Sequence, residues 1–213
     1  FKYYKMSADK GHSGAMNACG FMLKNGNGIP INNEEAIKYF KMAIEKDNPN
    51  ALHNYARMLY KGDGIPINKE EAIKYYKMSI EKGNCYSMRN YARILYKGDG
   101  IPINKEEAAK YYKMSADKGD CEAMNEYASM LYEGDGIPMN KEEAAKYYKM
   151  SADKGDCKAM YKYANMLYEG DGIPMNKEES IKYYKMSADK GDCEAMDKCA
   201  IMLYEGNGVP NDK

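Results

Sequence analysis

Four cysteines recur at intervals of 36 residues and are the most regular reactive side chains in the sequence: Cys85, Cys121, Cys157 and Cys193. Each falls at the predicted start of a helix, where the helix dipole favours negative charge, so redox or metal chemistry is one interpretation. Helix axes pack about 8 to 10 Å apart and a disulfide needs Cα atoms within about 7 Å, so cysteines of successive repeats should not pair. Ser13 and Pro49 occupy the same position. Structural thiols in a reducing compartment are therefore the favoured interpretation.

The remaining reactive side chains do not indicate catalytic machinery. The two histidines, His12 and His53, have no serine, cysteine or carboxylate at a spacing that would fix a catalytic triad or a zinc site. The repeated Gly-Asp-Gly-Ile-Pro segment lacks the third glycine of a dinucleotide-binding turn and the aspartate spacing of a calcium loop. We therefore expect no catalytic residues, no metal and no cofactor, and an enzyme is the less favoured class of function.

Charge and hydropathy narrow the range of partners. The chain has 32 acidic and 32 basic side chains, so a nucleic acid partner is not indicated. No apolar run approaches the roughly 20 residues needed to span a bilayer, and no signal-peptide pattern opens the chain. We expect no membrane association and a cytoplasmic location. The chain starts at Phe1 within a helical pattern, so we also expect a fragment of a longer protein.

A fixed period organises the whole sequence. The triplet Gly-Ile-Pro begins at Gly28, Gly64, Gly100, Gly136 and Gly172, and Gly-Val-Pro follows at Gly208. This spacing predicts a single array over residues 1–213. Its full repeats are 12–47, 48–83, 84–119, 120–155 and 156–191, with half repeats at 1–11 and 192–213. A period of this length is typical of repeat architectures in which each unit stacks on the next.

Residues 120–155 show that each repeat contains two helices. Asp120 is a good N-cap for a first helix, and Gly134 ends it. Asn140 followed by Glu143 has the form of a capping box for a second helix, which Gly155 ends. One helix pair cannot bury its apolar side alone, so the pairs must stack. The predicted fold is all-α, a right-handed α/α superhelix (solenoid) of 36-residue helix-turn-helix repeats.

Paired tyrosines recur at one place in the second helices: Tyr75, Tyr76, Tyr111, Tyr112, Tyr147, Tyr148, Tyr183 and Tyr184. We interpret them as packing between repeats in a chain that has no tryptophan. A stacked row of tyrosines that binds ligand aromatics is the alternative.

The repeat resembles a known family. The pattern Ala-x-x-x-Tyr-Ala-x-Met-Leu-Tyr-x-Gly-x-Gly-Ile-Pro, followed by Glu-Glu-Ala-x-Lys-Tyr-Tyr and Ser-Ala-Asp-Lys-Gly, is similar to the Sel1-like repeat, a relative of the tetratricopeptide repeat. The resemblance covers essentially the whole chain. The family prefers Leu-Gly where this chain has Tyr127 and Ala128, and often has tryptophan near Tyr147. The resemblance implies an adaptor or scaffold that binds a protein or peptide, or a regulatory array attached to a kinase or other enzyme domain outside this chain.

Differences between repeats concentrate on one side of the first helices, opposite the apolar side, at five positions spaced i, i+3, i+4, i+7 and i+11. We expect this side to line a concave groove for a partner; the alternative is drift on a solvated face. The candidate groove residues are His53, Arg57, Tyr86, Arg89, Asn90, Arg93, Asn125, Ser129, Tyr161 and Asn165. These five positions are basic in the second and third repeats and acidic in the fourth.

The two half repeats predict a further interaction. Tyr3 and Tyr4 lie in a second-type helix without its first helix, and Leu203 and Tyr204 lie in a first-type helix without its second. Both should expose apolar stacking surface, because neither helix has its partner helix in the array. Terminal repeats normally carry polar residues on this surface, which prevent association, whereas these half repeats carry apolar ones. We expect weak end-to-end self-association.

Overall fold

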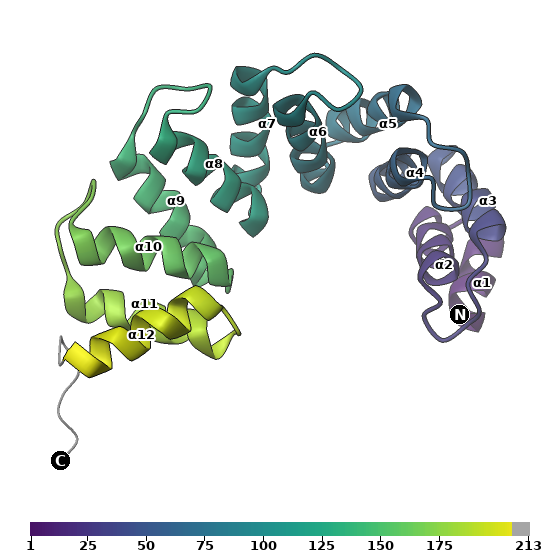
Figure 1. The fold of residues 1–213 in the computed structure, drawn as a ribbon. Helices are drawn as coiled ribbons and strands as arrows, with labels where there is room; N and C mark the ends of the chain where they lie inside the picture. Colours follow the sequence, from purple (N-terminus) through teal and green to yellow (C-terminus); the bar gives the residue numbers. More distant parts are fainter. Residues whose placement is uncertain (206–213) are drawn as a thin grey trace. The chain divides into compact units, whose positions relative to one another are not determined.

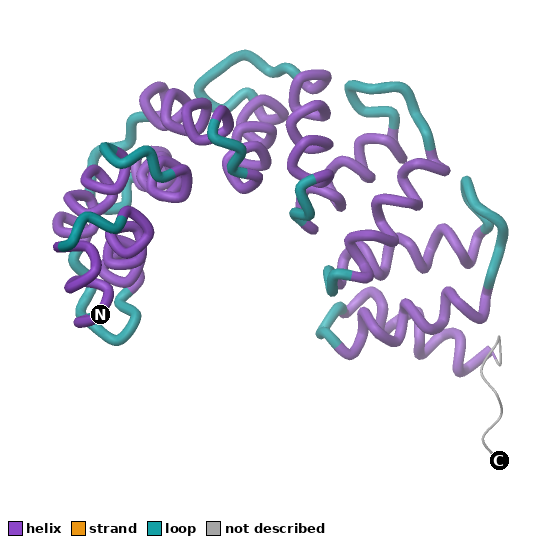
Figure 2. The backbone as a smooth tube through the Cα atoms, turned by 180° about the vertical axis from the view of Figure 1, so that it is seen from behind, coloured by secondary structure: helices purple, strands orange, loops and turns teal. Residues whose placement is uncertain are grey.

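The computed structural model describes residues 1–205, and every regular element in that range is an α-helix (Figures 1 and 2). The helices are α1 (Lys2–Asp9), α2 (Ser13–Asn25), α3 (Asn33–Ile44), α4 (Pro49–Lys61), α5 (Lys69–Glu81), α6 (Cys85–Lys97), α7 (Lys105–Asp117), α8 (Cys121–Glu133), α9 (Lys141–Asp153), α10 (Cys157–Glu169), α11 (Lys177–Asp189) and α12 (Cys193–Glu205). The predicted all-α solenoid of helix-turn-helix repeats is confirmed. The Gly-Val-Pro triplet at Gly208 lies outside the described residues.

The helices belong to two compact units, residues 1–103 and 104–213, which we describe separately. In the first unit each helix from α1 to α6 packs on the next one in sequence, and in the second unit the same holds from α7 to α12. Within each unit, packing is most extensive between the first and second helices of one repeat, such as α4 with α5 or α8 with α9. Even-numbered helices are the first helices of the predicted repeats, and odd-numbered helices are the second helices.

The helix ends follow the predicted capping chemistry. The Asp120 side chain accepts a hydrogen bond from the Ala123 N–H (3.2 Å) at the start of α8. The Asn140 side chain accepts one from the Glu143 N–H (3.0 Å) at the start of α9. Gly134 ends α8 with φ of 70°, in the left-handed region that favours glycine. An N-cap of this kind contributes about 1 kcal/mol to helix stability.

Tyrosine and alanine fill the space between helices. Ala128 and Ala164 are fully buried in α8 and α10, where a larger side chain would hold neighbouring helices apart. The rings of Tyr127 and Tyr147 meet edge to face, with centroids 4.9 Å apart. Tyr163 and Tyr183 repeat this arrangement at the same distance. These ring contacts lie within one repeat, whereas the Tyr147 and Tyr183 hydroxyls reach the preceding repeat by donating to Asp117 and Asp153 (3.0 Å each).

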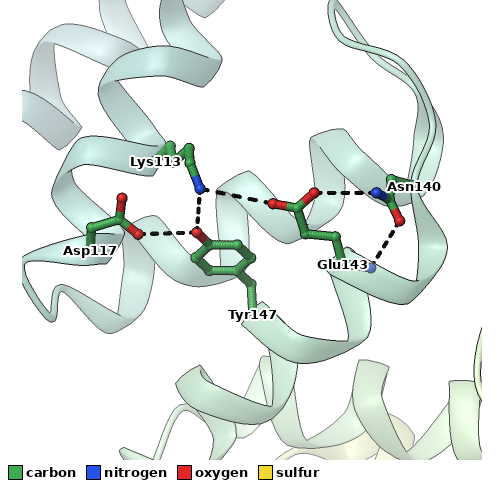
Figure 3. A network of polar contacts seen from close by, with 5 residues as sticks. All are labelled: Lys113, Asp117, Asn140, Glu143 and Tyr147. Carbon is green, nitrogen blue, oxygen red and sulfur yellow. Dashed lines mark hydrogen bonds and ion pairs between the residues drawn. The ribbon is translucent and has the colours of Figure 1, made fainter.

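A polar network joins successive second helices in the second unit (Figure 3). The Tyr147 hydroxyl on α9 donates to the Asp117 carboxylate (3.0 Å) and accepts from Lys113 Nζ (2.7 Å), both on α7. Lys113 also lies 3.8 Å from the Glu143 carboxylate, which accepts a hydrogen bond from the Asn140 amide (3.2 Å). The capping box thus also contacts the preceding repeat.

The turn aspartates have a role that the sequence analysis missed. Asp171 accepts hydrogen bonds from the Tyr132 hydroxyl (2.6 Å) and from Lys141 Nζ (2.8 Å), which both belong to the preceding repeat. In the first unit Asp99 accepts from Tyr60 and Lys69 in the same way. These bonds lower the pKa of both carboxyl groups. Each turn is therefore fastened to the repeat before it.

Candidate functional site

A groove of about 600 Å³ lies along the first helices of the first unit. Its lining residues come from α2, α4 and α6, and we call this surface the basic groove: Asn17, Phe21, Asn50, His53, Asn54, Arg57, Lys61, Tyr86, Arg89, Asn90 and Arg93. Six candidate residues of the sequence analysis meet here: His53, Arg57, Tyr86, Arg89, Asn90 and Arg93. The candidates Asn125, Ser129, Tyr161 and Asn165 belong to the second unit.

The groove extends to a repeat that the sequence analysis did not include. Asn17 and Phe21 on α2 line its wall, although neither was a candidate. The signal was present in the repeat alignment, because these two residues occupy the same repeat positions as His53 and Arg57.

Positive charge gathers in the groove although the whole chain is neutral. Arg57, Lys61, Arg89 and Arg93 line it, and no carboxylate is among the lining residues. The Arg89 guanidinium lies 5.7 Å from the centroid of the Tyr86 ring. Arg93 donates a hydrogen bond to the side-chain oxygen of Asn90 (3.4 Å). Arginines held by aromatic and amide neighbours suit the recognition of carboxylate or phosphate groups.

Asparagine amides line the same groove. The Asn54 amide nitrogen donates to the Asn17 side-chain oxygen (2.9 Å), and Asn84 donates to the Asn50 oxygen (2.8 Å). Because these two oxygens are engaged, Asn17 and Asn50 can offer amide N–H donors to a ligand. The groove can therefore bind main-chain carbonyl groups as well as anions.

Burial corrects one part of the sequence analysis. The variable face was expected to lie opposite the apolar side, but His53, Asn90 and Asn125 are less than a tenth exposed. Around His53, the rings of Tyr76 on α5 and Tyr86 on α6 lie with their centroids 5.9 and 6.1 Å from the imidazole. Burial lowers the pKa of His53 to about 3, and the nearby charges of Arg57 and Arg89 act in the same direction. The imidazole is therefore neutral at pH 7.

The four candidates in the second unit have different surroundings. A cavity of about 140 Å³ is lined by Tyr132, Glu133, Tyr148, Lys162, Asn165 and Met166, so Asn165 is the only candidate on its wall. Ser129 accepts hydrogen bonds from Lys162 Nζ (2.6 Å) and from the Tyr148 hydroxyl (3.0 Å). Burial lowers the pKa of Lys162, although Glu126 and Glu133 oppose that shift.

The aromatic candidate of this unit also packs within the array. The Tyr161 ring lies 5.8 Å from that of Tyr184, whose hydroxyl donates to the Asn165 side chain. The cavity wall carries one acidic side chain, Glu133 on α8, and one basic side chain, Lys162 on α10.

The structure also bears on the possible metal sites, on membrane-spanning helices and on the repeated cysteine positions. Within residues 1–205, no cluster of three or more His, Cys, Asp or Glu side chains is placed to hold a metal ion. None of the described helices has the length and apolar character to cross a membrane. The main-chain carbonyls of Cys121 and Cys157 accept hydrogen bonds from Ser151 (2.8 Å) and Ser187 (2.7 Å), so these positions join successive helices.

Stacked helix pairs with a lined groove on their first helices define a helical repeat protein of the solenoid class. The Sel1 repeat model matches the chain at residues 1–12, 13–48, 49–84, 85–120, 121–156, 157–192 and 193–213. The chain belongs to the Sel1 repeat family. Proteins of this family are generally protein-interaction scaffolds, and the repeat is a non-catalytic type.

Solved structures show the same fold. A protective antigen of uropathogenic Escherichia coli strains, which displays this repeat fold, has 26% identity and a TM-score of 0.88 over 96% of this chain and 44% of that protein. A Sel1 repeat protein from Oxalobacter formigenes has 26% identity and a TM-score of 0.86 over 95% of this chain and 83% of its own. An immunity protein from Pseudomonas aeruginosa, 18% identical, is similar in fold with a TM-score of 0.60, over 88% of this chain and 72% of its own.

The chain spans less than half the length of the Escherichia coli antigen. No curated protein matched it significantly.

Proposed function

We propose that this chain is a protein-interaction scaffold whose basic groove holds an acidic, extended segment of another protein. The observation that carries the proposal is the charge of the groove, which has four cationic side chains and no carboxylate among its lining residues. A groove of one charge attracts the opposite charge and penalises a segment of its own sign. The partner is therefore acidic where it enters.

The four cationic side chains differ in burial, so we expect them to contribute differently to binding affinity and to association rate. Arg57 and Arg89 are half-buried, whereas Lys61 and Arg93 are exposed. Ion pairs at partly desolvated positions are stronger than exposed pairs, which mainly raise the association rate. Arg57 and Arg89 are thus the proposed anchors, and Lys61 and Arg93 help to draw the segment in. Tyr86, which is half exposed beside Arg89, packs against it.

The shape of the surface favours a chain segment over a small substrate. The groove crosses three helices and is lined by amides at several points along its length. The main-chain N–H groups within those helices are satisfied by helical hydrogen bonds, so recognition comes from side chains. An extended segment can place a side chain or a main-chain group at each of these points.

A charge-reversal experiment tests the proposal. The probe is a fluorescent ten-residue peptide of alternating aspartate and alanine, and its lysine–alanine counterpart is the specificity control. We expect Arg89→Glu/Arg93→Glu to weaken binding of the acidic probe by about tenfold or more. The melting temperature should change little, because both side chains lie outside the core. Fluorescence anisotropy gives the affinities.

A matched variant separates the groove from net charge. Lys46→Glu/Lys74→Glu makes the same change in charge at exposed lysines of the same unit that do not line the groove. This control should bind within about twofold of the unmodified protein. Equal binding of the acidic probe after the arginine reversal would refute the proposal, and so would equally tight binding of the lysine–alanine peptide.

A further inference from the structure

We infer that His53 Nε2 accepts a hydrogen bond from a main-chain N–H of the bound segment, so the basic groove recognises an N–H flanked by acidic side chains, not a bare oxyanion. This inference rests on the proposed function and specifies the chemical group that the ligand presents to His53.

A chain of hydrogen bonds fixes the tautomer of His53. The Ser79 hydroxyl lies 2.7 Å from the Pro49 carbonyl oxygen, which can only accept, so Ser79 uses its one proton there. Ser87 Oγ lies 2.8 Å from Ser79 Oγ, so Ser87 must donate to Ser79. His53 Nδ1 lies 3.0 Å from Ser87 Oγ, whose proton is already used. The proton of the neutral ring therefore sits on Nδ1.

This fixed tautomer leaves Nε2 as the unprotonated nitrogen of a residue that lines the groove. The rings of Tyr76 and Tyr86 flank the imidazole, with centroids 5.9 and 6.1 Å away. Arg57 and Arg89 are the charged groups that act on it, and together with burial they keep the ring neutral. A lone pair therefore lies among cations in the groove.

Comparison with the other repeats shows that the fold does not require this relay. Ser151 and Ser187 occupy the position of Ser79 and make the same bond to a helix-start carbonyl. At the position of Ser87 the other repeats have alanine: Ala15, Ala51, Ala123, Ala159 and Ala195. The position of His53 holds Asn17, Arg89, Asn125, Tyr161 and Asp197 in those repeats. Ser87 and His53 are thus a paired departure from the repeat, in the unit that holds the basic groove.

The lone pair decides which part of a ligand can lie on it. Carboxylates and fully ionised phosphate groups offer only acceptor oxygens, and two acceptors repel each other. A main-chain N–H is a donor, and in an extended segment the neighbouring side chains point to alternate sides. The acidic side chains can then reach Arg57 and Arg89 while the N–H meets Nε2. This arrangement gives Nε2 of the histidine a hydrogen-bond donor and gives the two arginines acidic partners at the same time.

The first measurement is made on the free protein. Because the chain has only two histidines, labelling with ¹⁵N-histidine gives few signals, and a His12 variant assigns them. Long-range ¹H–¹⁵N correlation should show His53 neutral at pH 7 with the proton on Nδ1. Ser87→Ala should remove this preference and give a mixture of tautomers. A proton on Nε2 in the unmodified protein would overturn the inference.

The second measurement adds two probes separately, the aspartate–alanine peptide and inorganic phosphate. We expect the peptide to shift the Nε2 signal in the direction of hydrogen-bond acceptance while Nδ1 keeps its proton. Peptide binding without any change at Nε2 would overturn the inference and leave the proposed function standing. Phosphate binding at Nε2 without peptide binding would overturn both. Binding of neither probe would refute the proposed acidic-segment function, and the inference with it.

Ester substitution identifies the donor directly. In a series of peptides, one main-chain amide at a time is replaced by an ester, which lacks the N–H. We expect one position to lose about tenfold in affinity for the unmodified protein. The same ester should cause little further loss in His53→Asn, in which the shorter side chain can still donate to Ser87 but has no group at Nε2. If no position depends on His53, the inference is wrong.

Discussion

Single residues of the basic groove owe their properties to their neighbours. Arg57 and Arg89 are half-buried, and they lie beside a histidine that burial keeps neutral. His53 would add a fifth positive charge if it were protonated, which the two arginines oppose. The groove therefore combines fixed cations with one hydrogen-bond acceptor. The same neutral histidine also links the groove to the stability of the fold at acidic pH.

The first prediction is that His53 makes the protein less stable in acid. The pKa of His53 is about 3 in the folded protein, whereas an unfolded chain has the ordinary histidine pKa of 6.5. The unfolded chain therefore takes up a proton first as pH falls. The lowered pKa means that stability is lost below about pH 6.5, by about 1.4 kcal/mol per pH unit until about pH 3. His53→Asn should remove this contribution.

The measurement is urea unfolding of both proteins at about pH 7.5 and about pH 5. Relative to the variant, the unmodified protein should lose about 2 kcal/mol of unfolding free energy between those values. Asparagine is a suitable replacement because Asn17 and Asn125 occupy this position in other repeats. The same loss in both proteins would show that His53 stays protonatable in the folded state.

At the scale of elements, each turn must pack against the repeat before it. Gly136 has φ of 78°, and a Cβ placed there would lie 2.3 Å from Lys105 Cβ at the start of α7. Gly172 approaches Lys141 in the same way, at 2.4 Å. The close approach lets Asp135 and Asp171 reach the lysines of the preceding repeat. A side chain at this glycine would therefore disturb both the backbone and the contact between repeats.

The second prediction concerns these glycines. Gly28 has the same backbone conformation, with φ of 73°, but a Cβ there would meet no described atom within 4 Å. Gly28→Val should therefore cost only the strain of positive φ, about 1 to 3 kcal/mol. Gly136→Val should cost at least about 1 kcal/mol more, because it adds the clash with Lys105. Thermal and urea unfolding of the two variants give the difference, and equal costs would contradict the close-approach explanation.

At the scale of the whole molecule, stacking leaves the terminal helices with uncovered apolar side chains. Tyr3 is 83% exposed on α1, whereas its equivalents Tyr147 and Tyr183 are buried. Leu203 is 58% exposed on α12, whereas Leu131 and Leu167 at the same repeat position are 4% exposed. Tyr4 and Tyr204 add to these two surfaces. Such surfaces are normally covered by a neighbouring repeat.

The third prediction is that the chain self-associates weakly through its end helices. Sedimentation velocity from micromolar to millimolar concentration should show a rising average mass. Tyr3→Glu/Leu203→Glu should abolish the rise by placing charge on both surfaces. Tyr86→Glu is the matched control, because Tyr86 is also half exposed but lies in the groove. A constant monomer mass in the unmodified protein, or a rise that survives the end substitutions, would contradict this prediction.

The sequence by itself determined the local structure and its repetition. The caps at Asp120 and Asn140 and the glycine at Gly134 act through main-chain contacts within a few residues, so their effect can be read from neighbours in the chain. The 36-residue period then implied stacking and placed the paired tyrosines in the core. Six groove residues could also be proposed, because variation among the repeats marked one side of the first helices.

Only the tertiary structure decided what surrounds those residues. The burial of His53 depends on how α4, α5 and α6 pack, and its tautomer depends on Ser79 and Ser87, which lie 26 and 34 residues further along the chain. The hydrogen bond that Lys141 donates to Asp171 likewise spans 30 residues. A sequence pattern along one helix indicates on which side of that helix a residue lies, but it does not give the distance from the residue to the next helix. Desolvation and hydrogen bonding depend on that distance, so the chemistry of the groove required the fold.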